Sequence, residues 1–267
     1  MFRKLLVCLD GSALAEKILP LARALTAPKE GKLTFLRIIP EAAALEDDYM
    51  RDCARRYGAE LRFLVSSDPG AAIAAELDRD PHAVAALTTH GRTAWTEAIL
   101  GSVALRVIRE ARRPVVVFRP VAGGREPPKT IGTIAVPLDG SKFSERIIPY
   151  AAKAALFLSA QLNLLQVLPP HAALTPLTEL QKSDVFESSY LQRKTAEIAA
   201  GHGIEPQWEV LHGDPADALC RYLSDMPETL LAMTTHARSG RERAVIGSVA
   251  ATCVRRSGVP LLLYWPR

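Results

Sequence analysis

The chain has 267 residues, of which 48% are hydrophobic and 23% charged, and its formal net charge is +4. This length suits two domains of ordinary size, and the composition excludes an intrinsically disordered chain. Lysine and arginine are scattered rather than blocked, so we interpret them as solvated helix faces and expect no nucleic-acid partner. No stretch approaches the ~20 apolar residues of a membrane span, and the first apolar run stops at Asp10, too early for a secretion signal. We therefore predict a cytoplasmic protein without membrane contact.

Internal matches indicate that one pattern is written twice along the chain. Three pairs of segments match in order: LVCLDGS at 6–12 with AVPLDGS at 135–141, TTHG at 88–91 with TTHA at 234–237, and GSVA at 101–104 with GSVA at 247–250. The first pair is separated by 129 residues and the other two by 146, so the second copy carries an insertion of 17 residues. We place this insertion between Pro169 and Asp214, in the loop and helix after the second strand of that copy.

Short apolar runs alternate with Ala-, Leu-, Glu- and Arg-rich segments of helical length. In the first copy the predicted strands are residues 4–9, 32–38, 60–65, 83–88 and 115–118. Nearly continuous apolar runs are typical of a parallel sheet covered on both faces, so each copy is predicted to be a doubly wound α/β domain. We place domain 1 at residues 1–120, a Gly/Pro-containing linker at 121–130 and domain 2 at 131–267.

The start of the first helix can be predicted in both copies. Ser12 and Ser141 occupy positions where a hydroxyl can cap the first free amides. Pro20 and Pro149 fall inside the helical pattern that follows, so we expect a kink or a break at each.

The four cysteines, Cys8, Cys53, Cys220 and Cys253, form no C-x-x-C pair and have no metal-ligand spacing. Such cysteines are typical of buried or free thiols in a reducing compartment.

Three features converge on one edge of the predicted sheet. Asp10 ends the first strand, Ile38 ends the second, and the stretch from Thr88 to Ser102 follows the fourth. Ligands of open parallel sheets bind beyond the carboxyl ends of the strands, where a carboxylate can accept hydrogen bonds from ribose or an amine and helix amides can face phosphate. The alternative is structural: Asp-Gly-Ser could be a turn with a cap, and Gly101 a close-packing glycine. The residues alone leave both open.

Taken together, the strand followed by Asp-Gly-Ser, the TTHG segment and the GSVA segment nine residues later resemble the universal stress protein family. The resemblance covers both copies, and the tandem form occurs in that family. It implies a five-stranded parallel sheet in each domain, with helices on both faces, and a pseudo-dimer in which the domains pair through their last strands. It also implies binding of ATP or a related adenine nucleotide, with or without Mg²⁺.

Nucleotide-binding members of that family carry Gly, two residues, Gly, nine residues, Gly, then Ser or Thr. The first copy departs from this signature only at Thr88, whereas the second departs at Thr234 and Ala237. We therefore predict that domain 1 is the main nucleotide site. The resemblance implies a domain 1 site of Cys8, Leu9, Asp10, Ile38, Leu87, Thr88, His90, Gly91, Arg92, Gly101, Ser102 and Val103. The weaker domain 2 site comprises Pro137, Leu138, Asp139, Val167, Met233, Thr234, Ala237, Arg238, Gly247, Ser248 and Val249.

The expected function is that of a cytoplasmic stress-response protein that binds ATP mainly in domain 1 and acts as a sensor or interaction module. Its expected partners are the other domain of the same chain, a second copy in a homodimer, and an unidentified protein. The alternative is a dimerisation scaffold of the same fold that binds no nucleotide. We predict no catalytic residue and no metal site, because nucleophile-elbow, zinc and P-loop motifs are missing from the sequence. Weak ATP hydrolysis is an option that rests on fold analogy alone.

Overall fold

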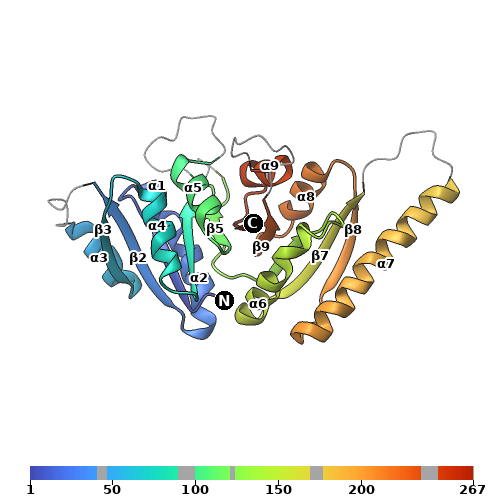
Figure 1. The fold of residues 1–267 in the computed structure, drawn as a ribbon, viewed down its shortest axis with the longest axis horizontal. Coiled ribbons are helices and arrows are strands. Elements are labelled where there is room, and N and C mark those ends of the chain that lie inside the picture. The colour runs from blue at the N-terminus through green and yellow to red at the C-terminus, as the bar shows by residue number, and fades with distance from the viewer. Residues whose placement is uncertain (41–46, 90–99, 121–123, 169–176, 236–245, 267) are drawn as a thin grey trace.

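The computed structural model describes residues 1–267 except 41–46, 90–99, 121–123, 169–176, 236–245 and 267, and for residues 177–188 it describes the backbone only (Figure 1). In the first half the elements are β1 Lys4–Cys8, α1 Ala13–Glu16, α2 Leu19–Thr26, the 3-10 helix η1 Ala27–Lys29, β2 Lys32–Ile39, α3 Asp48–Tyr57, β3 Glu60–Val65, α4 Pro69–Asp78, β4 Ala83–Thr88, α5 Ser102–Glu110 and β5 Val115–Phe118. In the second half they are β6 Thr133–Pro137, the 3-10 helix η3 Ser144–Ile147, α6 Ile148–Leu158, β7 Gln161–Leu168, α7 Leu177–His202, β8 Gln207–His212, α8 Pro215–Ser224, β9 Thr229–Thr234, α9 Ser248–Arg256 and β10 Leu261–Tyr264. The predicted strands of the first copy are confirmed, each to within one residue at either end.

The ten strands of the described residues belong to one sheet with the order β3-β2-β1-β4-β5-β10-β9-β6-β7-β8. Every neighbouring pair is parallel except β5 and β10, which are antiparallel, with Val116 opposite Leu262. Each half is therefore a five-stranded parallel sheet, and the two halves join through their last strands. The predicted doubly wound α/β architecture and the pairing of the halves are confirmed.

Helices cover both faces of this sheet. Side chains that alternate along a strand lie in two separate hydrophobic cores, one on each face. In β1, Leu5 and Val7 belong to the core cluster that includes residues of α2, α3 and α6, whereas Leu6 belongs to the cluster on the other face, which includes residues of α4, α5, α8 and α9. All three side chains are buried. Burial on both faces explains why the strands read as continuous apolar runs.

The first helix of each half begins close to the predicted serine and breaks before the predicted proline. The Ser12 hydroxyl accepts a hydrogen bond from the Ala15 amide at 3.1 Å and caps α1. A new helix then begins with Pro20 in its first turn, and Pro149 has the same place in α6. Both predicted breaks are confirmed.

The cap predicted at Ser141 differs in one respect. Its hydroxyl accepts from the Ser144 amide at 3.1 Å, as expected, but the segment that follows is the 3-10 helix η3. The Ser144 hydroxyl donates to the Ser141 carbonyl at 2.9 Å and so competes for an acceptor that the first α-helical turn uses. Ala15, at the corresponding position of the first half, has no such hydroxyl.

The two halves differ most in the helix after the second strand. This helix has 10 residues in α3 and 26 in α7. Figure 1 shows α7 as a long helix beside β7 and β8, at the end of the molecule away from the first half. Of the helices in the described part of the chain, none has the length and apolarity that a membrane crossing requires.

The helical layer on one face also joins the two halves. Phe2 of the first half packs edge-on against Phe157 of α6, with ring centroids 6.1 Å apart. Lys29 donates from Nζ to the carbonyl oxygen of Leu156 at 2.9 Å, and its ammonium lies 5.8 Å from the centre of the Phe157 ring. The seam between the halves is therefore stabilised by strand pairing and by apolar packing.

Phe157→Ala is expected to destabilise the protein by roughly 3 kcal/mol, because it removes a buried aromatic ring from this seam. The Phe157 residue is only 4% exposed. The matched control is Leu156→Ala on the same helix, where the side chain is 43% exposed. Urea unfolding followed by circular dichroism measures both changes. Equal losses in the two variants would contradict the packing of Phe157 between the halves.

Candidate functional site

The turn after β1 is built by one carboxylate and one glycine. Asp10 accepts through Oδ1 from the backbone amide of Ser12 at 3.0 Å and from the Ser12 hydroxyl at 2.6 Å. Gly11 has a φ of +78°, and a Cβ at this position would collide with the Arg37 guanidinium. The Asp-Gly-Ser segment is therefore a turn with a cap, and it holds the Asp10 carboxylate at the carboxyl end of the strand.

The second half repeats this turn after β6. Asp139 Oδ1 accepts from the Ser141 amide at 3.0 Å and from the Ser141 hydroxyl at 2.5 Å, and Gly140 has a φ of +79°. The Ser144 hydroxyl accepts from the Asp139 amide at 3.3 Å. Burial opposes ionisation of Asp139, but the hydrogen bonds from Ser141 and Ser144 outweigh it and hold the pKa of the carboxyl below its ordinary value. The carboxylate is charged at neutral pH.

The helix that follows the fourth strand opens with a glycine in each half. Gly101 is the N-cap of α5, its amide donates to the Thr89 carbonyl oxygen at 2.5 Å, and a Cβ here would lie 2.8 Å from that oxygen. Gly101 is thus required by close backbone packing. Gly247 has the same place before α9.

These two glycines leave the amino ends of α5 and α9 without a side-chain cap in the described part of the chain. By contrast, Asp68 caps α4 and Asp214 caps α8. The amides of an uncapped first turn carry partial positive charge and suit an anion such as phosphate. The sheet order reverses direction between β1 and β4, and between β6 and β9. The carboxyl ends of these strands, which we call the candidate edge of each half, therefore lie at a topological switch point.

The structure places the other predicted site residues that it describes at matching positions in the two halves. Cys8 ends β1 and Pro137 ends β6; Ile38 lies in β2 and Val167 in β7; Leu87 and Thr88 end β4, and Met233 and Thr234 end β9; Ser102 and Val103 open α5, and Ser248 and Val249 open α9. Leu9 and Leu138 are buried directly after β1 and β6. Burial raises the pKa of the Cys8 thiol to about 12, so this thiol stays protonated. His90, Gly91, Arg92, Ala237 and Arg238 lie outside the described residues.

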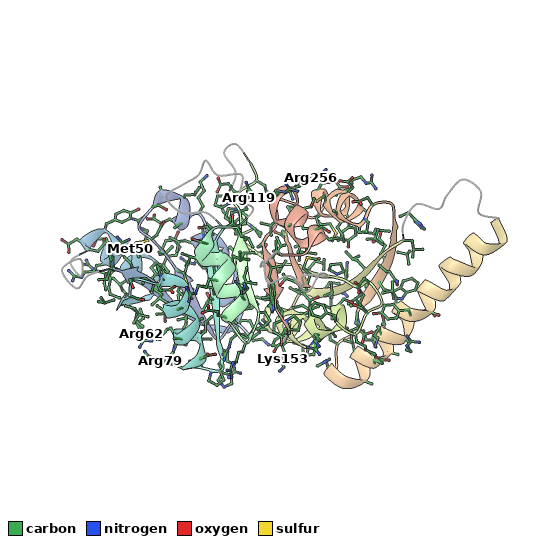
Figure 2. All side chains as sticks on the ribbon, turned by 45° about the horizontal axis from the view of Figure 1, so that its top comes forward. Met50, Arg62, Arg79, Arg119, Lys153 and Arg256 are labelled. Carbon is green, nitrogen blue, oxygen red and sulfur yellow. The ribbon has the colours of Figure 1, made fainter. Side chains whose placement is uncertain are left out.

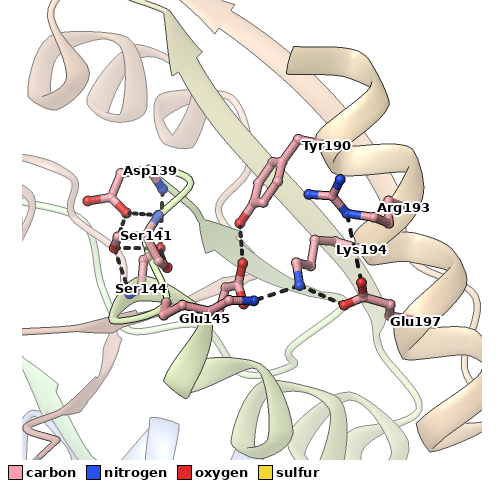
Figure 3. Close-up of polar contacts among 9 residues, drawn as sticks. Asp139, Ser141, Ser144, Glu145, Tyr190, Arg193, Lys194 and Glu197 are labelled. Atoms are coloured by element: carbon pink, nitrogen blue, oxygen red, sulfur yellow. Dashed lines mark hydrogen bonds and ion pairs between the residues drawn. The ribbon is translucent and has the colours of Figure 1, made fainter. Parts of the chain in front are cut away.

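A polar network next to Asp139 was not predicted from the sequence. The Tyr190 hydroxyl of α7 donates to Glu145 Oε1 at 3.1 Å (Figure 3). Lys194, one turn further along α7, reaches Glu145 Oε2 at 3.1 Å and Glu197 Oε2 at 2.6 Å. The network ties α7 to the segment that follows the Asp139 turn.

The electrostatics of this network follow from burial and opposite charge. Burial opposes the charged form of Glu145, yet hydrogen bonds from Lys142 and Lys194 hold its pKa below the ordinary value. Burial and the neighbouring Glu145 carboxylate raise the pKa of Tyr190. Lys194 is desolvated, but its two carboxylate partners raise its pKa, so the pair stays ionised.

One signal in the sequence could have located part of this network. Glu16 and Glu145 are 129 residues apart, which is the offset of the aligned turns. In the first half the Glu16 carboxylate raises the pKa of Tyr49 on α3, so a tyrosine beside this glutamate recurs in both halves. Lys194 had no such signal. It lies in the region where the offset between the two halves changes from 129 to 146 residues, so α7 cannot be aligned with α3 from the sequence.

The first half has a different charge arrangement at its second strand. Arg37 Nε lies 3.1 Å from Asp47 Oδ2, and Asp47 also caps α3 by accepting from the Met50 amide at 3.0 Å. At the corresponding position of β7 the residue is Gln166, which is buried. The two candidate edges therefore share a turn but differ in the charge beside it. Within the described residues, no group of three or more His, Cys, Asp and Glu side chains is placed to hold a metal ion.

Lys194→Met is expected to destabilise the protein by about 3 kcal/mol, because it removes a buried ammonium and leaves the largely desolvated Glu145 carboxylate to the exposed Lys142. The Lys194 side chain is only 7% exposed. The matched control is Arg193→Ala, since Arg193 forms an exposed ion pair with Glu197 at 3.8 Å and should contribute less than about 0.5 kcal/mol. Chemical unfolding of both variants measures the difference. A Lys194 variant as stable as the Arg193 variant would disprove the role of the buried pair.

Glu145→Gln should destabilise the protein in a pH-dependent way. The folded-state pKa of Glu145 is lowered, so its contribution is present above the unfolded pKa of about 4.3 and is lost as pH falls through the lower folded value. The difference in unfolding free energy between wild type and variant is therefore expected to be largest near pH 6 and to shrink towards about pH 3. Urea titrations across that range test the sign. A difference that grows on acidification would contradict it.

Comparisons with known proteins agree with this fold. The model of the universal stress protein family matches residues 53–119 and 130–264. Universal stress protein MJ0531 of Methanocaldococcus jannaschii is 26% identical over 138 residues, which are 49% of this chain and 79% of that protein. Universal stress protein Slr1230 of Synechocystis is 27% identical over 183 residues, which are 67% of this chain but only 56% of that longer protein.

Among solved structures, a universal stress protein from Archaeoglobus fulgidus superposes with a TM-score of 0.70 at 18% identity, over 100% of both chains. This likeness extends the agreement in fold to the whole chain. The family match covers well over half of the residues and spans elements of both halves. The chain therefore belongs to the universal stress protein family.

Proposed function

We propose that the chain binds an adenine nucleotide, with ATP as the first candidate, at the carboxyl edge of the first half. The observation that carries this proposal is the pairing of a carboxylate and an uncapped helix across one switch point. Asp10 follows β1, and α5 begins at Gly101 after β4, which is the direct neighbour of β1 in the sheet. An adenine nucleotide carries ribose hydroxyls for the first group and phosphates for the second.

Each group has a distinct role in this proposal. Asp10 accepts hydrogen bonds from a ribose hydroxyl or from the exocyclic amine of the base. The amides at the start of α5, including that of Ser102, bind phosphate oxygens, and Mg²⁺ would accompany the phosphates. No side chain is assigned to a chemical step, so the proposed activity is binding rather than catalysis.

We propose that the second half contributes a weaker nucleotide site or none. Its sequence departs from the family signature at Thr234 and Ala237. In addition, α7 is held against the segment after Asp139 by Tyr190 and Lys194. These contacts favour a scaffold role for domain 2, at residues 131–267, beside a binding role for domain 1 at residues 1–120. The linker at 121–130 completes this proposed division.

We further propose that the protein works in the cytoplasm as a stress-response sensor or interaction module. A nucleotide bound at a switch point contacts two loops and one helix, so occupancy can alter a surface that a protein partner or a second copy reads. The alternative function is a scaffold in which neither half binds nucleotide, and the strand pairing of the halves alone supports this candidate.

Asp10→Asn is expected to weaken binding of Mg-ATP by roughly tenfold or more, because a charge-assisted hydrogen bond to the nucleotide is lost. The asparagine oxygen can still accept from Ser12, so the turn is retained. The matched control is Asp139→Asn in the corresponding turn of the second half, which should leave the main affinity unchanged. Isothermal titration calorimetry measures both variants.

Two results would decide against nucleotide binding. One is wild-type protein that releases no nucleotide on denaturation and shows neither heat nor a thermal shift with millimolar Mg-ATP. The other is equal weakening by Asp10→Asn and Asp139→Asn, which would remove the proposed asymmetry. The first result would leave the scaffold as the function of both halves.

A further inference from the structure

Two cysteines that are distant in the sequence face each other between α8 and α9. Cys220 lies in α8 and Cys253 in α9, both belong to the same buried cluster, and the two thiols are neighbours that act on one another. Both are free thiols in this structure. Their neighbours are apolar residues of the two helices, including Leu219 and Val254, so the pair lies within a packed layer.

An ion pair independently shows that these faces of the helices meet. Arg256 Nη1 of α9 lies 2.6 Å from Asp217 Oδ1 of α8. Asp217 is one helical turn before Cys220, and Arg256 is one turn after Cys253, so the ion pair crosses the same part of the interface as the thiols. Arg256 itself lies at the molecular surface, as Figure 2 shows.

The two thiols are not equivalent. Cys220 retains 9% of its surface, whereas Cys253 is fully buried. The neighbouring Cys253 thiol, assisted by the nearby Arg256 guanidinium, holds the pKa of Cys220 below that of an ordinary thiol. The neighbouring Cys220 thiol and burial raise the pKa of Cys253. Cys220 is therefore the nucleophile of the pair, because the thiolate is the reactive form.

The other two cysteines, and the positions in the first half that correspond to Cys220 and Cys253, serve as internal comparisons for the reactivity of this pair. Burial raises the pKa of both Cys8 and Cys53, so each is less reactive than an ordinary thiol. The first half has Ala74 and Val107 at the positions that correspond to the thiol pair at the offset of 146 residues. A reaction of this pair is thus confined to the second half.

We propose that Cys220 and Cys253 are an oxidation site that forms a reversible intramolecular disulfide with hydrogen peroxide. The Cys220 thiolate attacks one peroxide oxygen, the O–O bond breaks, and the departing hydroxide takes a proton to leave as water. Cys220 is thereby oxidised to a sulfenic acid while the peroxide is reduced. The Cys253 sulfur then attacks the Cys220 sulfur, the S–O bond breaks, and the Cys253 proton leaves with the hydroxide as a second water.

The geometry requires only a local movement. A disulfide needs sulfur atoms about 2.05 Å apart. Because the two cysteines lie in one buried cluster between helices that an ion pair also joins, side-chain rotations and a slight approach of the helices bring their sulfurs together. The bond would lock α8 against α9. Because α9 begins at Gly247 and Ser248, oxidation would restrain the helix whose amino end faces the candidate edge of the second half. The inference does not depend on nucleotide binding there.

Peptide mapping after peroxide treatment of the folded, full-length wild-type chain tests the proposal. Reduced protein, once denatured, should take up N-ethylmaleimide at all four cysteines. Oxidised protein should take it up only at Cys8 and Cys53 and should yield a peptide that links Cys220 to Cys253. Dithiothreitol should restore full labelling.

Variants test the order of the steps. Cys253→Ala should stop at a sulfenic acid on Cys220 that dimedone traps, whereas Cys220→Ala should give no adduct at Cys253. A Cys8→Ser, Cys53→Ser double variant is the matched control and should form the cross-link as wild type does. Hydrogen exchange in oxidised wild type should slow in α9 and remain unchanged in α5.

The wild-type experiment needs no substitution, so failure of a variant to fold does not affect it. Full labelling of Cys220 and Cys253 after peroxide treatment would overturn the proposal. A disulfide that involves Cys8 or Cys53, or one that joins two chains, would overturn it equally.

Discussion

The antiparallel pairing of β5 with β10 is the constraint on which the rest of this structure depends. Both strands are short, and the residues from Val115 to Phe118 and from Leu261 to Leu263 are buried almost completely. A strand with these side chains could not remain an exposed edge, because it would present unpaired backbone groups and apolar surface together. The last strand of each half therefore pairs with the backbone groups of the other half's last strand and covers its apolar side chains. The sheet then ends at β3 and β8, where side chains are more exposed.

This pairing leaves the carboxyl edge of each half at its own switch point, and the same turn is built at both. The turn needs a glycine with positive φ and an acidic side chain that accepts from the serine two residues later. Gly101 is fixed by another cause, the close approach of the Thr89 carbonyl. Residues expected to contact a ligand thus also have local structural reasons to be present. Structural and binding roles are compatible here, because the turn presents the Asp10 carboxylate at the edge.

The two halves differ in the helix that follows the second strand, which is α3 in the first half and the longer α7 in the second. In the second half, both Tyr190 and Lys194 of α7 reach Glu145. In the first half, the corresponding Glu16 has Tyr49 beside it, and the described residues show no lysine that pairs with it. A buried ammonium between carboxylates is a strong local constraint, because removal of either partner leaves a desolvated charge. The described part of the second half therefore has an ion-pair network beside its turn that the first half does not show. The thiol pair between α8 and α9 adds a chemical difference on the opposite face of the sheet.

The sequence by itself determined the doubly wound fold, the strands, the proline breaks and the repeat of the Asp-Gly-Ser turn. These features depend on local periodicity and on turn residues, which act over a few positions. The alternation of buried faces was equally readable, because parallel strands covered on both sides must be apolar throughout. Family resemblance supplied the pairing of the last strands, which the sheet order confirms. The ligand residues remain predictions.

Only the tertiary structure decided which distant side chains meet. Lys194 meets Glu145 through the docking of α7, and Cys220 meets Cys253 through the packing of two helices. Neither pair has a spacing that a sequence pattern could reveal, because the partners lie on different elements whose relative rotation is set by core packing. The structure also showed that the segment after Ser141 forms a 3-10 helix, where the Ser144 hydroxyl competes for the Ser141 carbonyl, whereas Ser12 caps an α-helix.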